Sequence, residues 1–212
     1  MSASAQKRPP VMDLVAGPQG SGKSTFFPVR ESGVAAFNVD EHRKSLNRGS
    51  SENIPEHVLR RALADYEAFI EGHIRAKESF SIEVTLGKDI TFQQARKAKR
   101  AGFSVEMTFV AAELQDCLAR VAKRLEAGGH GVPPEVITAT HEASMKNLPR
   151  ALAQFDAVVV YENAGLAGPE IDPASLFPRL VLEAQSGRVT FVAEGPPEWL
   201  RKALAGSRFE LK

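Results

Sequence analysis

The sequence predicts an α/β protein with three layers, in which a mostly parallel five-stranded sheet is covered by helices on both faces. Two observations support this fold class. Short apolar runs typical of buried strands alternate with longer segments of helical periodicity. A glycine-rich loop stands directly after the first apolar run, where such folds bind phosphate. The length of 212 residues suits one domain of this class, with some chain left for an appendage.

The glycine-rich loop matches the pattern G-x-x-x-x-G-K-[ST] and lies between an apolar strand (11–16) and a helix start. Glycines let backbone N–H groups turn inward around phosphate oxygens. Lys23 is expected to reach the β- and γ-phosphates, and the Ser24 hydroxyl to ligate Mg²⁺. ATP and Mg²⁺ are therefore the expected cofactors. The expected nucleotide-binding residues are Gly17, Pro18, Gln19, Gly20, Ser21, Gly22, Lys23, Ser24 and Thr25.

Further elements follow this loop in alternation. Apolar or alternating runs predict strands at 34–39, 79–85, 103–110 and 155–161. Helical spacing predicts helices at 55–77, 88–101, 113–127 and 135–148, the last two joined by a Gly-Gly-His-Gly segment. A basic helix, a glycine hinge and a returning helix predict a lid over about 113–148. Two β-prone runs around Ser186-Gly187 predict a small C-terminal hairpin.

The predicted domain organisation has three parts. Residues 1–10 read as a disordered leader, since they lack the apolar core of a signal peptide. Residues 11–165 form the phosphate-loop domain with its lid, and residues 166–212 form an appendage packed on the same domain.

Composition argues against several classes of function. A net charge of +1 gives no broad field for nucleic acid or an anionic membrane, and no apolar run is long enough to span a bilayer. The basic run within 88–101 reads as a solvated helix face, because no interleaved aromatic residues support a nucleic-acid site. The single cysteine, Cys117, excludes an intramolecular disulfide and fits a cytoplasmic location.

Two lone acids follow strands two and three, where open α/β sheets bind their ligands. Asp40 is the favoured general base, which would accept the proton of an attacking hydroxyl. Its alternative role is to cap a helix N-terminus. Glu83 is expected to hold substrate or Mg²⁺, with a structural role as the alternative. No guanine-reading segment is present, so a small kinase is favoured over a GTPase.

Several segments together, in this order and spacing, resemble the zeta-toxin family of P-loop kinases. They are 14–25 with the phosphate loop, 37–41 with Asp40, 80–87 with Glu83, 120–124 with two arginines, 129–133 and 161–163. The resemblance implies transfer of phosphate to the sugar 3′-hydroxyl of UDP-N-acetylglucosamine. It also implies a small helical antitoxin as a partner.

The resemblance assigns roles position by position. Asp40 matches the catalytic base, and Lys23 and Ser24 match the phosphate and Mg²⁺ ligands. Glu83 and Thr85 match the substrate segment, and Arg120 and Arg124 match catalytic basic positions of the lid. The stretch 135–145 departs from the pattern, because it lacks the arginines that the family usually carries there.

The missing arginines leave alternatives open, since an arginine at a transferring phosphate contributes about 10³–10⁵ in rate. Arg120, Arg124, Lys146 or Arg150 supplies the charge, or the kinase activity is weak or lost, or the acceptor differs. A polynucleotide 5′-kinase is disfavoured by the near-neutral charge.

Overall fold

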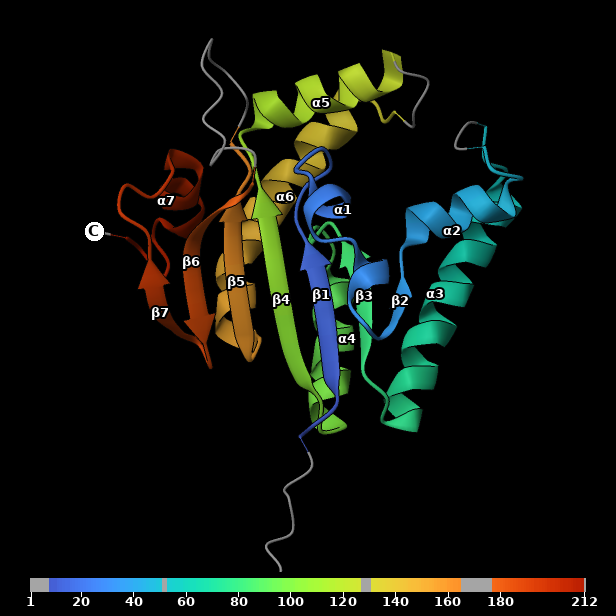
Figure 1. Cartoon of the computed structure of the whole chain (residues 1–212), viewed down its shortest axis with the longest axis horizontal. Helices are drawn as coiled ribbons and strands as arrows, with labels where there is room; N and C mark the ends of the chain where they lie inside the picture. Colours follow the sequence, from blue (N-terminus) through green and yellow to red (C-terminus); the bar gives the residue numbers. More distant parts are fainter. Residues whose placement is uncertain (1–7, 51–52, 127–130, 165–176, 212) are drawn as a thin grey trace, which may run out of the picture.

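The structure, a computed structural model, describes residues 8–50, 53–126, 131–164 and 177–211. Within these ranges seven strands form a single sheet in the order β2-β3-β1-β4-β5-β6-β7 (Figure 1). The strands are β1 (Val11–Ala16), β2 (Ala35–Phe37), β3 (Phe80–Val84), β4 (Ser104–Ala111), β5 (Ala157–Glu162), β6 (Arg179–Gln185) and β7 (Arg188–Val192). The helices are α1 (Lys23–Phe26), η1 (Val29–Glu31, a 3₁₀ turn), α2 (Val39–Leu46), α3 (Glu56–Ala76), α4 (Asp89–Arg100), α5 (Leu114–Glu126), α6 (Pro134–Gln154) and α7 (Glu198–Leu204).

The first five strands run parallel, as the alternating sequence pattern predicted. The predicted number of five strands is wrong, because β6 and β7 extend the sheet in antiparallel order instead of standing apart as a hairpin. The physical reason lies in β5. Val158 and Val160 are fully or almost fully buried, and β6 supplies Ala184 and Leu182 beside them. Without β6, the parallel sheet would end in an exposed apolar edge.

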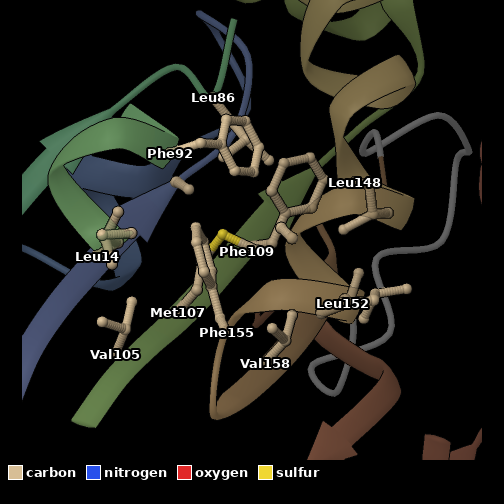
Figure 2. Packing of buried hydrophobic residues seen from close by; sticks show 14 of the residues in the cluster. Leu14, Leu86, Phe92, Val105, Met107, Phe109, Leu148, Leu152, Phe155 and Val158 are labelled. Atoms are coloured by element: carbon tan, nitrogen blue, oxygen red, sulfur yellow. The ribbon is translucent and has the colours of Figure 1, made fainter. Parts of the chain in front are cut away.

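The main core lies between the sheet and helices α3, α4 and α6. Figure 1 shows α4 and α6 behind the sheet and α3 beside its β2 edge. β1 directs Met12, Leu14 and Ala16 into this core. Figure 2 shows the rings of Phe92 and Phe155 among the core side chains, and the two rings stack with centroids 5.6 Å apart. On the opposite face, the described part of the chain places the short α1 and η1 near the strand ends (Figure 1). Polar residues of the strands alternate with the core residues and face this side of the sheet. Examples are Asp13 of β1 and Glu106 of β4, which are paired in the strand register.

The two ends of the segment between β5 and β6 are held together. Arg179 donates from Nε and Nη2 to Glu162 Oε2 at 3.1 and 2.9 Å. The same two residues are partners in the strand register. The chain therefore leaves and re-enters the sheet at neighbouring points.

The predicted domain division stays a prediction. Residues 1–7 of the predicted leader and 165–176 at the start of the appendage lie outside the described residues. The described part of the predicted appendage forms β6, β7 and α7, and Trp199, Leu200 and Leu204 belong to the main core. None of the described helices is long and apolar enough to cross a membrane.

The core predicts a contrast between two leucine truncations in long helices. Leu148 in α6 is fully buried, whereas Leu63 in α3 is 45% exposed. We expect Leu148→Ala to lower the free energy of unfolding by about 2–5 kcal/mol, through lost transfer energy and a residual cavity. Leu63→Ala should change it by less than about 1 kcal/mol. Urea denaturation of both variants tests this, and equal losses would contradict the assigned packing of α6.

Candidate active site

The phosphate loop connects β1 to α1 and is held by close backbone packing. Gly17, Gly20 and Gly22 all have positive φ angles. A Cβ at Gly17 would lie 2.0 Å from the Val110 carbonyl oxygen, and one at Gly20 would lie 2.5 Å from the Cys117 carbonyl oxygen. Only glycine fits such positions. The loop is therefore enclosed between the ends of β1 and β4 and helix α5.

Asn163, directly after β5, fixes the middle of the loop. Its Nδ2 donates to the Ser21 carbonyl at 2.8 Å, and its own N–H donates to the Ala111 carbonyl at 2.7 Å. A Cβ at Gly22 would lie 2.4 Å from this Nδ2 atom. The side chain of Asn163 thus occupies the space that glycine leaves open.

Lys23 is 7% exposed, and its Nζ donates to the carbonyls of Gly17 and Pro18, both at 2.8 Å. Burial lowers the pKa of Lys23, while the carboxylate of Glu83 partly opposes this effect. A buried ammonium that donates to two backbone carbonyls, with the charges of Glu83 and Asp40 nearby, is a favourable partner for a phosphate.

Glu83, at the carboxyl end of β3, connects the loop to the second strand. Ser24 Oγ lies 3.1 and 3.0 Å from the two carboxylate oxygens, and Asn38 Nδ2 donates to Oε2 at 2.9 Å. Burial raises the pKa of Glu83, while Lys23 and the Ser24 hydrogen bond act in the opposite direction. Glu83 therefore lies beside both loop residues that were predicted to bind phosphate and Mg²⁺.

Asp40 lies in the first turn of α2 rather than at the end of a strand, because β2 ends at Phe37. Its alternative role as the helix cap falls to Asn38, whose Oδ1 accepts from the N–H groups of Asp40 and Glu41. The Asp40 carboxylate is 57% exposed and accepts from Arg43 Nη1 at 3.2 Å. After the larger effects of burial, Lys23 and Ser24, its charge contributes to raising the pKa of Glu83. The two predicted acids therefore share one electrostatic environment.

The two lid arginines differ in their surroundings. Arg120 donates to the carbonyls of Asn163 and Ala164 at 3.0 and 3.2 Å, with a longer contact to Gly20 at 3.4 Å. It thus joins α5 to the phosphate loop and to the end of β5. Arg124 is exposed, and its charge contributes to lowering the pKa of Lys23, although burial is the largest cause.

Helix α6 is fixed to the sheet beside the site. The buried His141 ring lies 2.9 Å from the Ala112 carbonyl, and Ser144 Oγ donates to the Thr85 carbonyl. Thr85, a predicted substrate residue, thus lies against α6, whereas Thr25 is exposed on α1. From His141 onward, α6 is a fixed wall, so any motion of the predicted lid would involve α5 and the start of α6.

The donor set suits Mg²⁺ better than a transition metal. No cluster of three His, Cys, Asp or Glu residues with metal-binding spacing occurs in the part of the chain that the structure describes. Mg²⁺ commonly needs only one or two protein oxygens beside phosphates and waters. The Ser24 hydroxyl, next to the Glu83 carboxylate, provides such oxygens.

Comparison with protein families identifies the chain. The model of the zeta toxin family matches residues 1–167, well over half of the sequence. The chain belongs to the zeta toxin family. No curated protein matches its sequence. The match includes every segment on which the resemblance was based, from the phosphate loop to Asn163.

Solved structures share the fold of this zeta toxin family member. A chain of the AvrRxo1-ORF1:-ORF2 complex with ATP superposes with a TM-score of 0.61 at 17% identity, covering 86% of this chain and 60% of that one. A native form of that complex gives 0.65 at 19% identity, with coverages of 94% and 66%. The PezAT toxin–antitoxin system of Streptococcus pneumoniae gives 0.55 at 16% identity, with coverages of 81% and 77%. This chain thus spans less than two thirds of the AvrRxo1 chains, and the likeness establishes a P-loop kinase-like fold.

Sequence reasoning missed several residues that build the site. Asn38 caps α2 and binds Glu83, and Asn163 holds the phosphate loop. A signal for Asn38 was present, since asparagine directly before an Asp-Glu pair is a good helix cap. Asn163 stands in segment 161–163 of the family resemblance, but no local pattern predicted its contact, because its partner Ser21 is 142 residues away.

The packing of Asn163 predicts a contrast between two glycines with similar φ angles, +95° at Gly22 and +77° at Gly33. We expect Gly22→Ala to weaken ATP–Mg²⁺ binding at least tenfold, because the new methyl group collides with Asn163 and reshapes the loop. Gly33→Ala has nothing within 4 Å of the added atom and should bind like the wild type. Isothermal calorimetry measures both affinities. Unchanged binding by Gly22→Ala would contradict the role given to the loop.

The buried carboxylate of Glu83 predicts a pH dependence of stability. A raised pKa means that the folded state binds more protons above pH 4.5, so stability falls as pH rises. Glu83→Gln cannot ionise and so lacks this fall in stability. The free energy of unfolding of Glu83→Gln, relative to that of the wild type, should therefore increase as the pH is raised from 5 to 8. The exposed Glu71 is the control, because the Lys97 hydrogen bond lowers its pKa and Glu71→Gln should show no such increase. Urea denaturation across this pH range would refute the assignment if both variants behaved alike.

Proposed function

We propose that this zeta toxin family member is a kinase that transfers the γ-phosphate of ATP, with Mg²⁺, to a hydroxyl of a small molecule. The observation that carries the proposal is the hydrogen-bonded set of Ser24, Glu83 and Asn38. It joins the phosphate loop to the helix that bears Asp40.

In the proposed reaction each group has one task. The acceptor oxygen attacks the γ-phosphorus, the bond from that phosphorus to the β-bridging oxygen breaks, and ADP leaves with its electron pair. The Asp40 carboxylate takes the proton of the acceptor hydroxyl. Lys23 binds β- and γ-phosphate oxygens, and Glu83 and Thr85 orient the acceptor. Mg²⁺ held at Ser24 would neutralise charge on the phosphates.

Ser21 supports phosphate binding by this loop. Ser21 is fully buried, and its Oγ atom has no hydrogen-bond partner among the described residues. A buried hydroxyl without a partner is costly, and a nearby anion is a group that it could satisfy.

The favoured acceptor is a sugar nucleotide such as UDP-N-acetylglucosamine, which is what the resemblance of segments 37–41 and 80–87 to the zeta-toxin family implies. The family match over residues 1–167 includes both segments and supports this choice. We also propose a small helical antitoxin as a partner, since the family match is joined by a fold likeness to the PezAT toxin–antitoxin system. We also propose a cytoplasmic location, which is supported by the single, free thiol of Cys117.

A second candidate function is nucleotide binding with weak or lost transfer. Arg120 is engaged by backbone carbonyls of the loop region, and Arg150 pairs with Asp89 and lies over the ring of Phe92. The stretch 135–145 of α6 offers no arginine in their place. Arg124 and Lys146, also considered from the sequence, stand at exposed positions of α5 and α6.

The base assignment predicts the effect of one isosteric change. We expect Asp40→Asn to lower kcat for phosphate transfer by about 100-fold or more, because no carboxylate then accepts the hydroxyl proton. ATP affinity should remain within about threefold. The neighbouring Glu41→Gln is the control and should retain transfer. Mass spectrometry of products from ATP–Mg²⁺ and UDP-N-acetylglucosamine, extended to other sugar nucleotides, measures transfer.

Each outcome discriminates between the two candidates. Turnover by the wild type that Asp40→Asn abolishes supports the kinase. ATP binding without transfer or hydrolysis across the acceptor panel supports the binding protein. Wild-type turnover by Asp40→Asn would show that another group is the base.

A further inference from the structure

A pocket of about 310 Å³ lies between the first half of α6 and the loop that follows β3. We call it the α6 pocket; it is lined by Thr85, Gly87 and Lys88 on the loop side and by Val136, Ala139 and Ala143 of α6. Thr85 is two residues beyond Glu83, or about 7 Å of extended chain. The α6 pocket therefore begins next to the proposed transfer site.

The loop side of the α6 pocket is held in shape by α6. Ser144 Oγ donates to the Thr85 carbonyl, and Asn147 Nδ2 donates to the Leu86 carbonyl at 2.9 Å. Between them Leu86 is fully buried in the main core and has a φ of +60°. A leucine keeps this left-handed conformation only where its surroundings impose it, and such residues cluster at functional sites. The α6 pocket is thus built by specific contacts rather than left between loosely packed elements.

The surface of the α6 pocket is mostly apolar. Val136, Ala139 and Ala143 contribute carbon atoms, and Gly87 adds no side chain. The hydroxyl of Thr140, a further lining residue, donates to carbonyls of its own helix at 2.8 and 3.0 Å. Charges stand only at exposed positions, with Lys88 and Glu135 of opposite sign. A phosphate would find little to bind inside, whereas an uncharged apolar group would lose contact with water there.

We propose that the α6 pocket binds an apolar group of the acceptor, such as an aromatic ring or a branched acyl chain. This inference rests on the proposed kinase function, because it takes Glu83 and Asp40 as the place of the acceptor hydroxyl. In this proposal the stretch 135–145 of α6, which contains no arginine, contributes to acceptor binding. It gives this chain an apolar acceptor wall where the family usually places cations.

Two glycosides test the proposal without requiring turnover. Benzyl β-D-glucoside and methyl β-D-glucoside offer the same hydroxyls and differ in the aromatic ring alone. We expect the benzyl compound to bind the full chain at least about tenfold more tightly in calorimetry, through burial of the ring. It should also shift the methyl NMR signals of Val136, Ala139 and Ala143.

Three alanine-to-leucine variants complete the test. Ala143→Leu fills the interior of the α6 pocket, and Ala139→Leu fills its exposed mouth, where folding should not suffer. Both should abolish the preference for the benzyl compound. Ala68→Leu, at an exposed position of α3 that does not line this pocket, should keep it.

The results separate this inference from the kinase proposal. Equal affinity for the two glycosides, or a benzyl preference that survives both pocket variants, overturns the inference even if transfer depends on Asp40. A preference lost in both pocket variants supports the inference even if no acceptor is phosphorylated, and the kinase proposal would then fail alone.

Discussion

The arrangement of the site depends on the hydrogen bonds that the Glu83 carboxylate accepts from Ser24 and Asn38. This carboxylate is mostly buried, and burial raises its pKa, yet it accepts hydrogen bonds from Ser24 of the phosphate loop and Asn38 before α2. Ser24 and Asn38 come from the segments that follow β1 and β2, and Glu83 lies near the carboxyl end of β3. A single charged group therefore sets the relative position of the triphosphate side and the acceptor side. Its burial costs stability, which is typical of groups kept for function.

The acceptor side is more weakly anchored than the phosphate side. The phosphate loop is enclosed by β4, α5 and Asn163 at distances that admit only glycine. By contrast, α2, which carries Asp40, has no buried residue. It is held by the Asn38 cap, by the contact of His42 Nε2 with Asp65 at 2.9 Å, and by the His42 ring packed against Phe37. Local opening is easiest where few apolar contacts are buried, so α2 is the element of the site best able to adjust to different acceptors.

Much of the fold was predictable because its signals are local. The phosphate-loop motif and the alternation of strands and helices can each be recognised within about twenty residues. The position of the C-terminal hairpin in the sheet could not be predicted, because the pairing of Val160 with Leu182 is a long-range contact that no local pattern encodes. The same limit applied to the site. Asp40 and Glu83 could be proposed because each stands close to the end of an apolar run of the sequence, although Asp40 lies in the first turn of α2. The contact of Asn163 with Ser21, by contrast, exists only in the folded chain.

The pairing of Glu162 with Arg179 has a consequence for how this chain can diversify. Because the sheet holds both residues side by side, the ends of the intervening segment stay adjacent whatever its length. Loop-closure entropy changes slowly, by about 0.6 kcal/mol for each doubling of length. A change in the number of residues between Ala164 and Arg179 would therefore cost little loop-closure entropy. Asn163, in contrast, is fixed by its contacts with Ser21 and Ala111, so the support of the phosphate loop does not depend on that number.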